Sequence, residues 1–476
     1  MIAVWQGLLP LAPMQVMDYI GPWDFILVPI FTILAILIAR RIQFRRESDN
    51  PVYQYYTRGM MAKIFGGLAL AIIYVFYYGG GDTLNYWEDA GTLRNLMFKD
   101  FFCYLDILFG DTSIMNFFCF DDETGSPASI FLRDSKSYAV TRFTSIPYAL
   151  SIDSFFGCTI LVAIFSYMGV WRLYIMFTNE YPTLRKEMAI AVLFIPSVLF
   201  WGSGILKDTY TFSAACWFAY SFYNVSLRRH KVLINLAMVV VNSIVLISVK
   251  PYIFLGLMPG CLVLLVFKRM QSIESNFIKI LSFPMFFMIA AVIGGFVVSR
   301  SAESLGAYGS VDSLLDKAAA TQQDLKREAY EGNSFDIGDF DASLTGIISK
   351  APAAIFAGLF RPTLLDVRNV VMLISAIENT VIMLLFLYLL LRIGPFGFMK
   401  VTLNQPLVMF CFSFAIFFAF SVGLTTSNFG SLVRYKIPAM PFFVAGLYIV
   451  RYRWMLERGI IEEEIPEEEQ VVTIST

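Results

Sequence analysis

Residues 62–89 read AKIFGGLALAIIYVFYYGGGDTLNYWED. The first part of this stretch, Ala62 to Tyr78, is almost entirely apolar and approaches the length of about 20 residues that a helix needs to cross a bilayer. Three glycines and then Asp82 follow, so the chain can turn sharply where it leaves the membrane. An anion at that depth is costly unless it is solvated, paired or used. The stretch therefore predicts a transmembrane helix that delivers a functional carboxylate at its end.

The composition of the whole chain agrees with a membrane protein. Of its 476 residues 57% are hydrophobic and only 15% are charged, and the mean hydropathy is +0.65. A soluble domain could not bury that much apolar surface. The net charge of -1 gives no general attraction to nucleic acid, so we expect no such partner. The single histidine, His230, excludes a metal site built on several imidazoles and a Ser-His-Asp triad.

Apolar segments of bilayer length recur along the chain and predict an all-α, polytopic integral membrane protein with about eleven transmembrane helices. The predicted spans are 22–40, 62–79, 152–177, 188–206, 209–226, 232–249, 251–267, 280–299, 369–391, 405–424 and 437–451.

The distribution of lysine and arginine predicts the orientation of these spans. Basic clusters lie in every second connection, and such clusters mark the cytoplasmic side. The N-terminus is therefore expected outside and the C-terminus in the cytoplasm. The clusters are Arg40, Arg41, Arg45, Arg46, Arg58 and Lys63; Arg185 and Lys186; Arg228, Arg229 and Lys231; Lys268, Arg269 and Lys279; Arg392 and Lys400; Arg451, Arg453 and Arg458.

Two long connections, about 80–150 and 300–368, are expected outside the membrane. The second contains an amphipathic helical pattern at 311–332 and an apolar stretch at 348–359 that is typical of a helix lying on the membrane surface. Residues 1–451 are expected to form one transmembrane domain. Residues 452–476 are expected to form an acidic cytoplasmic tail.

The six cysteines divide into two groups. Cys103 and Cys119 share the first outer connection and could form a disulfide if that connection faces an oxidising compartment. The other four lie in apolar runs and are expected to be small core residues.

Polar and charged residues gather on the side predicted to be outside. Basic residues are usually sparse there, so several around one cavity would make a strong anion site. Arginine offers a planar fork to phosphate oxygens and lysine a compact charge. The candidate catalytic residue is Asp82; the candidate binding residues are Lys207, Lys250, Arg361, Arg434, Tyr86 and Asn428, with Lys436 nearby; and the supporting residues are Glu88, Asp89, Asp208 and Glu378.

Each of these residues also has a simpler structural interpretation. Asp82 could cap the helix that follows it. Lys207 and Asp208 could form a local ion pair, Lys250 could extend to the lipid headgroups, and Arg361 could bind lipid phosphate. No set of carboxylates makes a convincing metal site, although a divalent cation would be compatible with the residues present.

The outer motifs resemble a known family. The stretch from Gly80 to Tyr86 resembles the Asp-bearing loop of GT-C-fold glycosyltransferases, which use polyprenyl-phosphate-linked sugars on the non-cytoplasmic face. The wider series resembles membrane proteins of bacterial polysaccharide clusters, although Lys250-Pro251-Tyr252 stands where those proteins usually have Arg-Pro-His. The series comprises Gly81-Asp82, Phe200-Trp201-Gly202-Ser203-Gly204 with Lys207-Asp208, Lys250-Pro251-Tyr252, Phe360-Arg361-Pro362, Glu378, and Asn428 through Arg434 to Pro438.

The resemblance implies a multi-pass enzyme of the bacterial inner (plasma) membrane, either a glycosyltransferase or a glycan polymerase. Asp82 would be the general base, and a polyprenyl phosphate or pyrophosphate would be the leaving group held by the basic residues. The implied partners are a polyprenyl-phosphate-linked glycan and membrane lipid. No cofactor is required, and a divalent cation is optional.

Three alternatives stay open. The chain could be a polymerase or ligase that works with arginines alone, while Asp82 is only a structural cap. It could be a transporter or flippase for lipid-linked or anionic cargo, although no inverted repeats are evident. It could also be a non-catalytic scaffold that binds a partner through its outer loops. Convergence of the polar residues on a cavity would favour chemistry, and a flat patch would favour binding.

Overall fold

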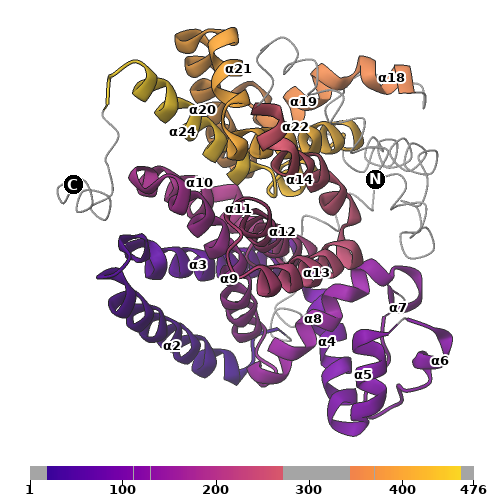
Figure 1. Cartoon of the computed structure of the whole chain (residues 1–476). Helices are drawn as coiled ribbons and strands as arrows, with labels where there is room; N and C mark the ends of the chain where they lie inside the picture. Colours follow the sequence, from indigo (N-terminus) through magenta and orange to yellow (C-terminus); the bar gives the residue numbers. More distant parts are fainter. Residues whose placement is uncertain (1–18, 111, 129, 272–343, 369, 462–476) are drawn as a thin grey trace.

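The structure is a computed structural model that describes residues 19–110, 112–128, 130–271, 344–368 and 370–461. Every element in these ranges is a helix (Figure 1). The predicted span at 280–299, the predicted amphipathic helix at 311–332 and most of the predicted acidic tail (462–476) lie outside the described residues.

Within these described ranges six helical segments are long and apolar enough to cross a membrane, so the chain is a helical membrane protein. A seventh arises if α23 (Phe429–Tyr435) and α24 (Met440–Glu457), which meet at a bend of 65°, form one span. The count of eleven and the orientation stay predictions. The six segments are α2 (Pro22–Glu47), the stretch Pro51–Tyr78 that contains η1 (Pro51–Tyr55), α3 (Tyr56–Ile73) and η2 (Tyr74–Tyr78), α9 (Phe155–Glu180), α13 (Val232–Val249), α20 (Val370–Ile393) and α22 (Pro406–Thr425).

The predicted span at 188–206 is not one helix. It is divided into α10 (Arg185–Leu193) and α11 (Pro196–Trp201). Pro196 has no backbone N–H and disfavours the helical conformation of the residue before it, and Ile195 is extended with ψ 120°. Further along, α12 (Lys207–Tyr223) with η4 (Asn224–Arg228), and α14 (Pro251–Gln271), occupy the predicted spans 209–226 and 251–267.

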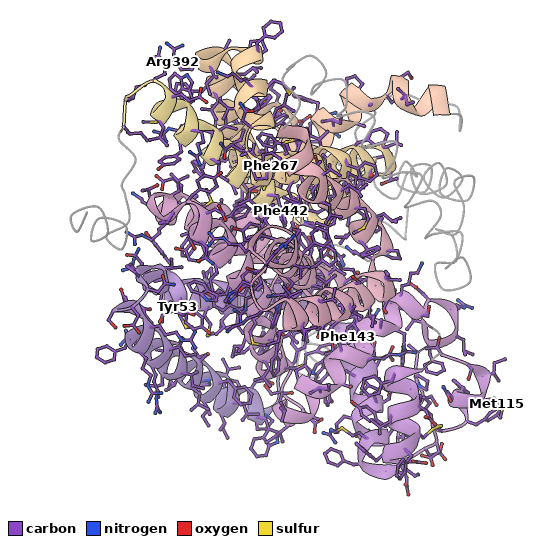
Figure 2. The ribbon with its side chains drawn as sticks, viewed as in Figure 1. Tyr53, Met115, Phe143, Phe267, Arg392 and Phe442 are labelled. Carbon is purple, nitrogen blue, oxygen red and sulfur yellow. A yellow bond between two sulfur atoms is a disulfide. The ribbon has the colours of Figure 1, made fainter. Side chains whose placement is uncertain are left out.

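Aromatic side chains fill the centre of the bundle. Phe442 of α24 is fully buried and packs against Phe177, Phe410 and Phe414 from α9 and α22 (Figure 2). These rings join helices that are far apart in the sequence, so the bundle forms around one shared core.

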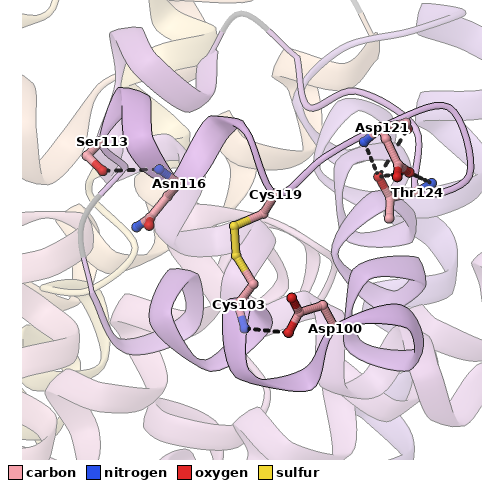
Figure 3. Close-up of a disulfide and its surroundings, with 7 residues drawn as sticks. All are labelled: Asp100, Cys103, Ser113, Asn116, Cys119, Asp121 and Thr124. Atoms are coloured by element: carbon pink, nitrogen blue, oxygen red, sulfur yellow. Dashed lines mark hydrogen bonds between the residues drawn. A yellow bond between two sulfur atoms is a disulfide. The ribbon is translucent and has the colours of Figure 1, made fainter.

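The first long connection folds into helices of its own, which we call the α4–α8 subdomain. It comprises α4 (Asp82–Lys99), α5 (Phe101–Phe109), α6 (Ile114–Phe117), α7 (Ile130–Arg133) and α8 (Ser135–Ser151). In this subdomain α4 packs against α8. A disulfide between Cys103 and Cys119 ties α5 to the segment after α6, and Asp100 caps α5 at the Cys103 amide (Figure 3). The cysteine pair that the sequence left open is therefore joined in the structure.

The stretch 348–359, predicted to lie on the membrane surface, packs on protein along one side. It belongs to α18 (Leu344–Ser349) and α19 (Ala351–Phe360), and α19 lies against α22. Glycines permit this close approach: a Cβ on Gly358 would lie 2.1 Å from the Ala419 carbonyl oxygen, and one on Gly423 would lie 2.0 Å from that of Ala354. The apolar residues of α19 are thus partly helix–helix contacts, which a hydropathy pattern cannot distinguish from lipid contacts.

The close contact predicts that Gly358→Ala separates α19 from α22 and destabilises the protein. Overpacking of this kind typically costs about 1–3 kcal/mol. Thermal unfolding in detergent measures the effect. Ala353→Val on the exposed side of the same helix is the matched control. Equal melting temperatures for wild type and Gly358→Ala would contradict the packing.

Candidate functional site

A cavity of about 620 Å³ opens where α3 and its π-helical extension end and α4 begins. α20 and α23 form much of the other side, and Trp201 at the end of α11 contributes to the wall. Asp82, Asn428 and Arg434 are the sequence-predicted site residues that line it, together with aromatic rings that include Tyr74, Trp201 and Tyr435.

Three consecutive glycines place Asp82 in this cavity. Gly79, Gly80 and Gly81 have φ angles of 65°, 153° and 111°, which side-chain-bearing residues rarely adopt. The turn ends η2 and starts α4 within a few residues, with Asp82 as the first helical residue. The Asp82 side chain is 48% exposed and faces the cavity rather than the interior.

Arg434 bridges Asp82, which faces the cavity, and Asp208, which is buried in the interior. Its Nη2 donates to Asp82 Oδ2 at 3.0 Å, and its Nε donates to Asp208 Oδ2 at 2.7 Å. The other oxygen of Asp208 accepts from Lys250 Nζ at 2.5 Å. The four side chains alternate in sign, from Asp82 at the cavity to Lys250 in the interior, and their formal charges sum to zero. We call these four residues the ion cluster.

The other predicted cations lie outside the cavity lining. Lys207 Nζ is 3.3 Å from Asp134 Oδ2, and Arg361 Nη2 is 2.6 Å from Asp366 Oδ1. Lys250 lies behind Asp208, with its ammonium 4.9 Å from the centre of the Tyr435 ring. Sequence spacing suggested one open anion site, whereas in the structure each of these cations faces a carboxylate.

Burial alone would raise the pKa of Asp134. Hydrogen bonds from Ser137 and the charge of Lys207 outweigh burial, so the pKa of Asp134 lies below its usual range. Asp134 therefore stays ionised at neutral pH and neutralises the nearest cation, Lys207. The same carboxylate caps α8 by accepting from the amides of Lys136 and Ser137.

Two charged residues near the site hold helices together. Glu378 of α20 accepts from the Ser197 amide at 2.8 Å and from the Ser197 hydroxyl at 2.6 Å. Lys436, fully buried between α23 and α24, donates to Asn379 Oδ1 at 2.6 Å and to the carbonyl oxygens of residues 359 and 361. Both residues therefore have structural roles around the break between α10 and α11 and the bend between α23 and α24.

Asn428 lines the cavity as the cap of α23. Its Oδ1 accepts from the amides of Gly430 and Ser431 at 2.8 and 3.3 Å. The cap fixes the start of the short helix that carries Arg434, which aims that guanidinium at Asp82.

The remaining predicted site residues on α4 point elsewhere. Tyr86 is 3% exposed and packs in the core between α4 and α8. Glu88 accepts a hydrogen bond from the Tyr19 hydroxyl at 2.5 Å, and Asp89 accepts one from the Ala128 amide at 3.0 Å. None of the three lines the cavity, so Asp82 is the only carboxylate among the described lining residues.

Sequence reasoning missed the aromatic wall of the cavity and the carboxylate partners of the cations. Tyr74 and Tyr78 are interpreted from sequence only as membrane aromatics, while Trp201, Phe429 and Tyr435 lie within outer motifs but are not named as site residues. Trp201 stands immediately before the Gly202-Ser203-Gly204 link, which is the one local hint that it lies at a site. Asp134 and Asp366 carry no sequence signal, because their partners are set by folding.

Within the described ranges, no group of three or more His, Cys, Asp or Glu residues could hold a metal ion, so no metal ligands are assigned. Comparison of the chain with protein-family models, curated proteins and solved structures finds no match.

The ion cluster predicts a large effect for Asp208→Asn. Asp208 is fully buried between two cations, and removing one partner of a buried ion pair typically costs about 3–5 kcal/mol. Asp134→Asn is the control, because its half-exposed pair with Lys207 contributes about 1 kcal/mol or less and asparagine still caps α8. Thermal unfolding of both variants measures the difference. Equal losses would show that the cluster does not stabilise the fold.

The buried carboxyl group of Asp89 leads us to predict that the stability of the protein depends on pH. Burial raises its pKa to about 6, against the hydrogen bond from Ala128 and with the help of the Glu88 charge. The folded state therefore keeps the Asp89 proton up to about pH 6, whereas the unfolded state loses it near pH 4. Protonation of Asp89 thus contributes its full stabilisation below about pH 4, and this stabilisation is lost as the pH rises through about 6. Asp89→Asn should gain on the order of 2 kcal/mol relative to wild type between pH 4 and 7. If the difference in melting temperature between Asp89→Asn and wild type were the same at every pH from 4 to 7, the prediction would be wrong.

Proposed function

We propose that the protein is a multi-pass enzyme of the bacterial inner membrane that transfers sugar from a polyprenyl-(pyro)phosphate-linked donor. The proposal places the reaction in the cavity beside Asp82, on the periplasmic face, and describes either a glycosyltransferase or a glycan polymerase. The observation that carries it is the direct contact, at 3.0 Å, between a cavity-facing carboxylate and a guanidinium in an aromatic-lined pocket.

The size and lining of the cavity suit such a substrate. Small-molecule sites typically occupy about 300–1,000 Å³ and combine apolar walls with a few placed polar groups. Here aromatic rings such as Tyr74 and Trp201 offer flat faces for a sugar ring, and Arg434 offers a fork for phosphate oxygens. Because the polar groups converge on a cavity rather than a flat patch, catalysis is favoured over a scaffold.

The contact between Asp82 and Arg434 suggests how substrate prepares the site. A donor phosphate would compete with Asp82 for the guanidinium, while Asp208 keeps Arg434 in place through Nε. Asp82 Oδ2 would then be released to act as a base. Arg434 would pass from one anion to another without losing its buried partner, so little reorganisation is needed.

In the chemical step, the acceptor hydroxyl oxygen attacks the anomeric carbon as Asp82 takes the hydroxyl proton. The bond between that carbon and the phosphate oxygen breaks, and the electron pair leaves with the phosphate. Arg434 stabilises the charge that grows on the leaving group. Direct displacement inverts the anomeric centre. Lys207, Lys250 and Arg361 would act from outside the cavity, through their charge and by holding its walls.

We further propose the topology predicted from the sequence: about eleven spans, the N-terminus outside, residues 1–451 as one domain and 452–476 as a cytoplasmic tail. The disulfide in the α4–α8 subdomain supports an outer location for that subdomain, because disulfides persist in oxidising compartments. Arg40 and Arg58 lie near the end of α3 opposite Asp82, as the positive-inside rule requires.

A transporter or flippase for lipid-linked cargo is the second candidate. Two broken or bent helix pairs, α10–α11 and α23–α24, meet at the cavity through Trp201 and Arg434. Discontinuous helices of this kind form substrate sites in transporters. The two candidates differ in whether the sugar is transferred or only moved.

The enzyme hypothesis predicts that Asp82→Asn lowers glycan synthesis in the native host by about 100- to 10,000-fold, the usual contribution of a general base. Surface glycan amount and chain length measure the effect. Asp106→Asn, an exposed change on α5 away from the cavity, is the matched control.

The leaflet in which lipid-linked donor accumulates in this variant separates the two candidates. Accumulation in the outer leaflet indicates a blocked transferase, and accumulation in the inner leaflet indicates a blocked transporter. Normal glycan from folded, abundant Asp82→Asn protein would refute the general-base role.

A further inference from the structure

A second cavity, of about 370 Å³, lies at the corner between α2 and α3. It is lined by Arg40, Gln43, Phe44, Glu47, Thr57 and Arg58. The helical stretch Pro51–Tyr78 separates this corner from the Asp82 cavity, and its 28 residues correspond to about 40 Å of helix. The two cavities are therefore distinct, and the inference drawn from this one does not depend on the proposed function.

Hydrogen bonds within α2, and from α2 to the stretch that contains η1 and α3, form the base of this corner. Gln43 Nε2 donates to Glu47 Oε2 at 2.9 Å, while Gln43 Oε1 accepts from the Thr57 amide at 3.3 Å. Close by, Arg46 Nη1 donates to the hydroxyl of Tyr53 in η1 at 2.8 Å. The corner is thus a formed site and not a chance gap between side chains.

The lining of the corner favours an anion. Two guanidinium groups, Arg40 and Arg58, and one carboxylate, Glu47, face it, so its net charge is +1 (2 − 1). The carboxylate already accepts a hydrogen bond from Gln43, whereas neither arginine forms an ion pair with a carboxylate in the described part of the chain. A phosphate group is suited to two guanidinium forks.

An apolar stripe continues from this charged corner along α2. Ile33, Leu37, Arg40 and Phe44 follow spacings of four, three and four residues and therefore share one helix face. Ile33, Leu37 and Phe44 are 55%, 58% and 86% exposed. A ligand that places an anion at Arg40 and a hydrocarbon chain along Leu37 and Ile33 would match both features.

We propose that this corner binds an anionic phospholipid, with its phosphodiester between Arg40 and Arg58 and one acyl chain along Leu37 and Ile33. Such a lipid would fasten the loosely packed helix α2 to the bundle. At the other end of α2 a protein contact does the same: Asp24 Oδ1 accepts from the Ser154 hydroxyl at 2.6 Å and from the Phe156 amide at 3.1 Å. Few other residues of α2 are buried.

The test compares lipid binding to the purified full chain by native mass spectrometry and thermal unfolding. The probes are dioleoyl phosphatidylglycerol, dioleoyl phosphatidylcholine with the same acyl chains, and inorganic phosphate. The wild type should retain phosphatidylglycerol and melt at a higher temperature with it. The double change Arg40→Gln with Arg58→Gln should weaken this binding by roughly tenfold or more.

Two further variants make the result specific. Arg41→Gln with Arg45→Gln removes the same charge from neighbouring positions that do not line the corner, and it should leave binding close to that of wild type. Glu47→Gln removes the opposing carboxylate and should tighten binding, which tests the proposal even if the arginine variant folds poorly.

Equal weakening by the two arginine double variants would show diffuse attraction to the membrane surface and overturn the proposal. Stabilisation by inorganic phosphate as strong as that by phosphatidylglycerol would overturn the lipid assignment. Equal binding of phosphatidylcholine and phosphatidylglycerol would exclude recognition of the anionic headgroup. Unchanged or weaker binding by Glu47→Gln would contradict the charge argument.

Discussion

The rest of the site depends on one interaction, the bridge that Arg434 makes between Asp82 and Asp208. Asp82 and Arg434 are 352 residues apart, and the four members of the ion cluster come from α4, α12, α23 and the residue before α14. Burying an unpaired Asp208 or Lys250 would cost much free energy. Because the charges of the cluster alternate in sign, each buried charge has an opposite charge beside it. The bridge also fixes the starts of α4 and α12 relative to α23. A cavity wall made from several short or broken helices therefore has a defined shape.

Broken helices near the cavity need other support. Pro196 separates α10 from α11, and a non-helical link follows Trp201 before α12 begins at Lys207. Lys63, predicted from sequence to lie on the cytoplasmic surface, is instead buried and donates to the carbonyl of Gly202 in this link. Glycines bring α3 close to the same region, since a Cβ on Gly67 would lie 2.8 Å from the Ser203 carbonyl oxygen. The Gly202 carbonyl, which follows the last residue of α11, is thus satisfied within the protein.

The α4–α8 subdomain and the bundle are mechanically linked by α4. Its first residue faces the cavity, while Leu93 and Leu96 on its buried side pack with Tyr138 of α8 in a core that the cysteines of the Cys103–Cys119 disulfide adjoin. Lys207 at the start of α12 reaches Asp134 at the start of α8. Asp82 therefore sits on a helix held from both sides, and the proposed general-base role would require such preorganisation.

The sequence by itself determined that the chain lies in a membrane and part of its local structure: apolar runs of bilayer length indicate membrane helices, and three glycines before Asp82 permit a sharp turn there. Both follow from short-range rules. The sequence also predicts that Asp82 and Arg434 lie on the same side of the membrane. Only the tertiary structure decided that Arg434 meets Asp82 while Lys207 and Arg361 meet Asp134 and Asp366, and that α19 packs on α22. Ionic pairing and helix contact depend on distances through space between residues far apart in the chain, and residue type and spacing alone do not fix those distances.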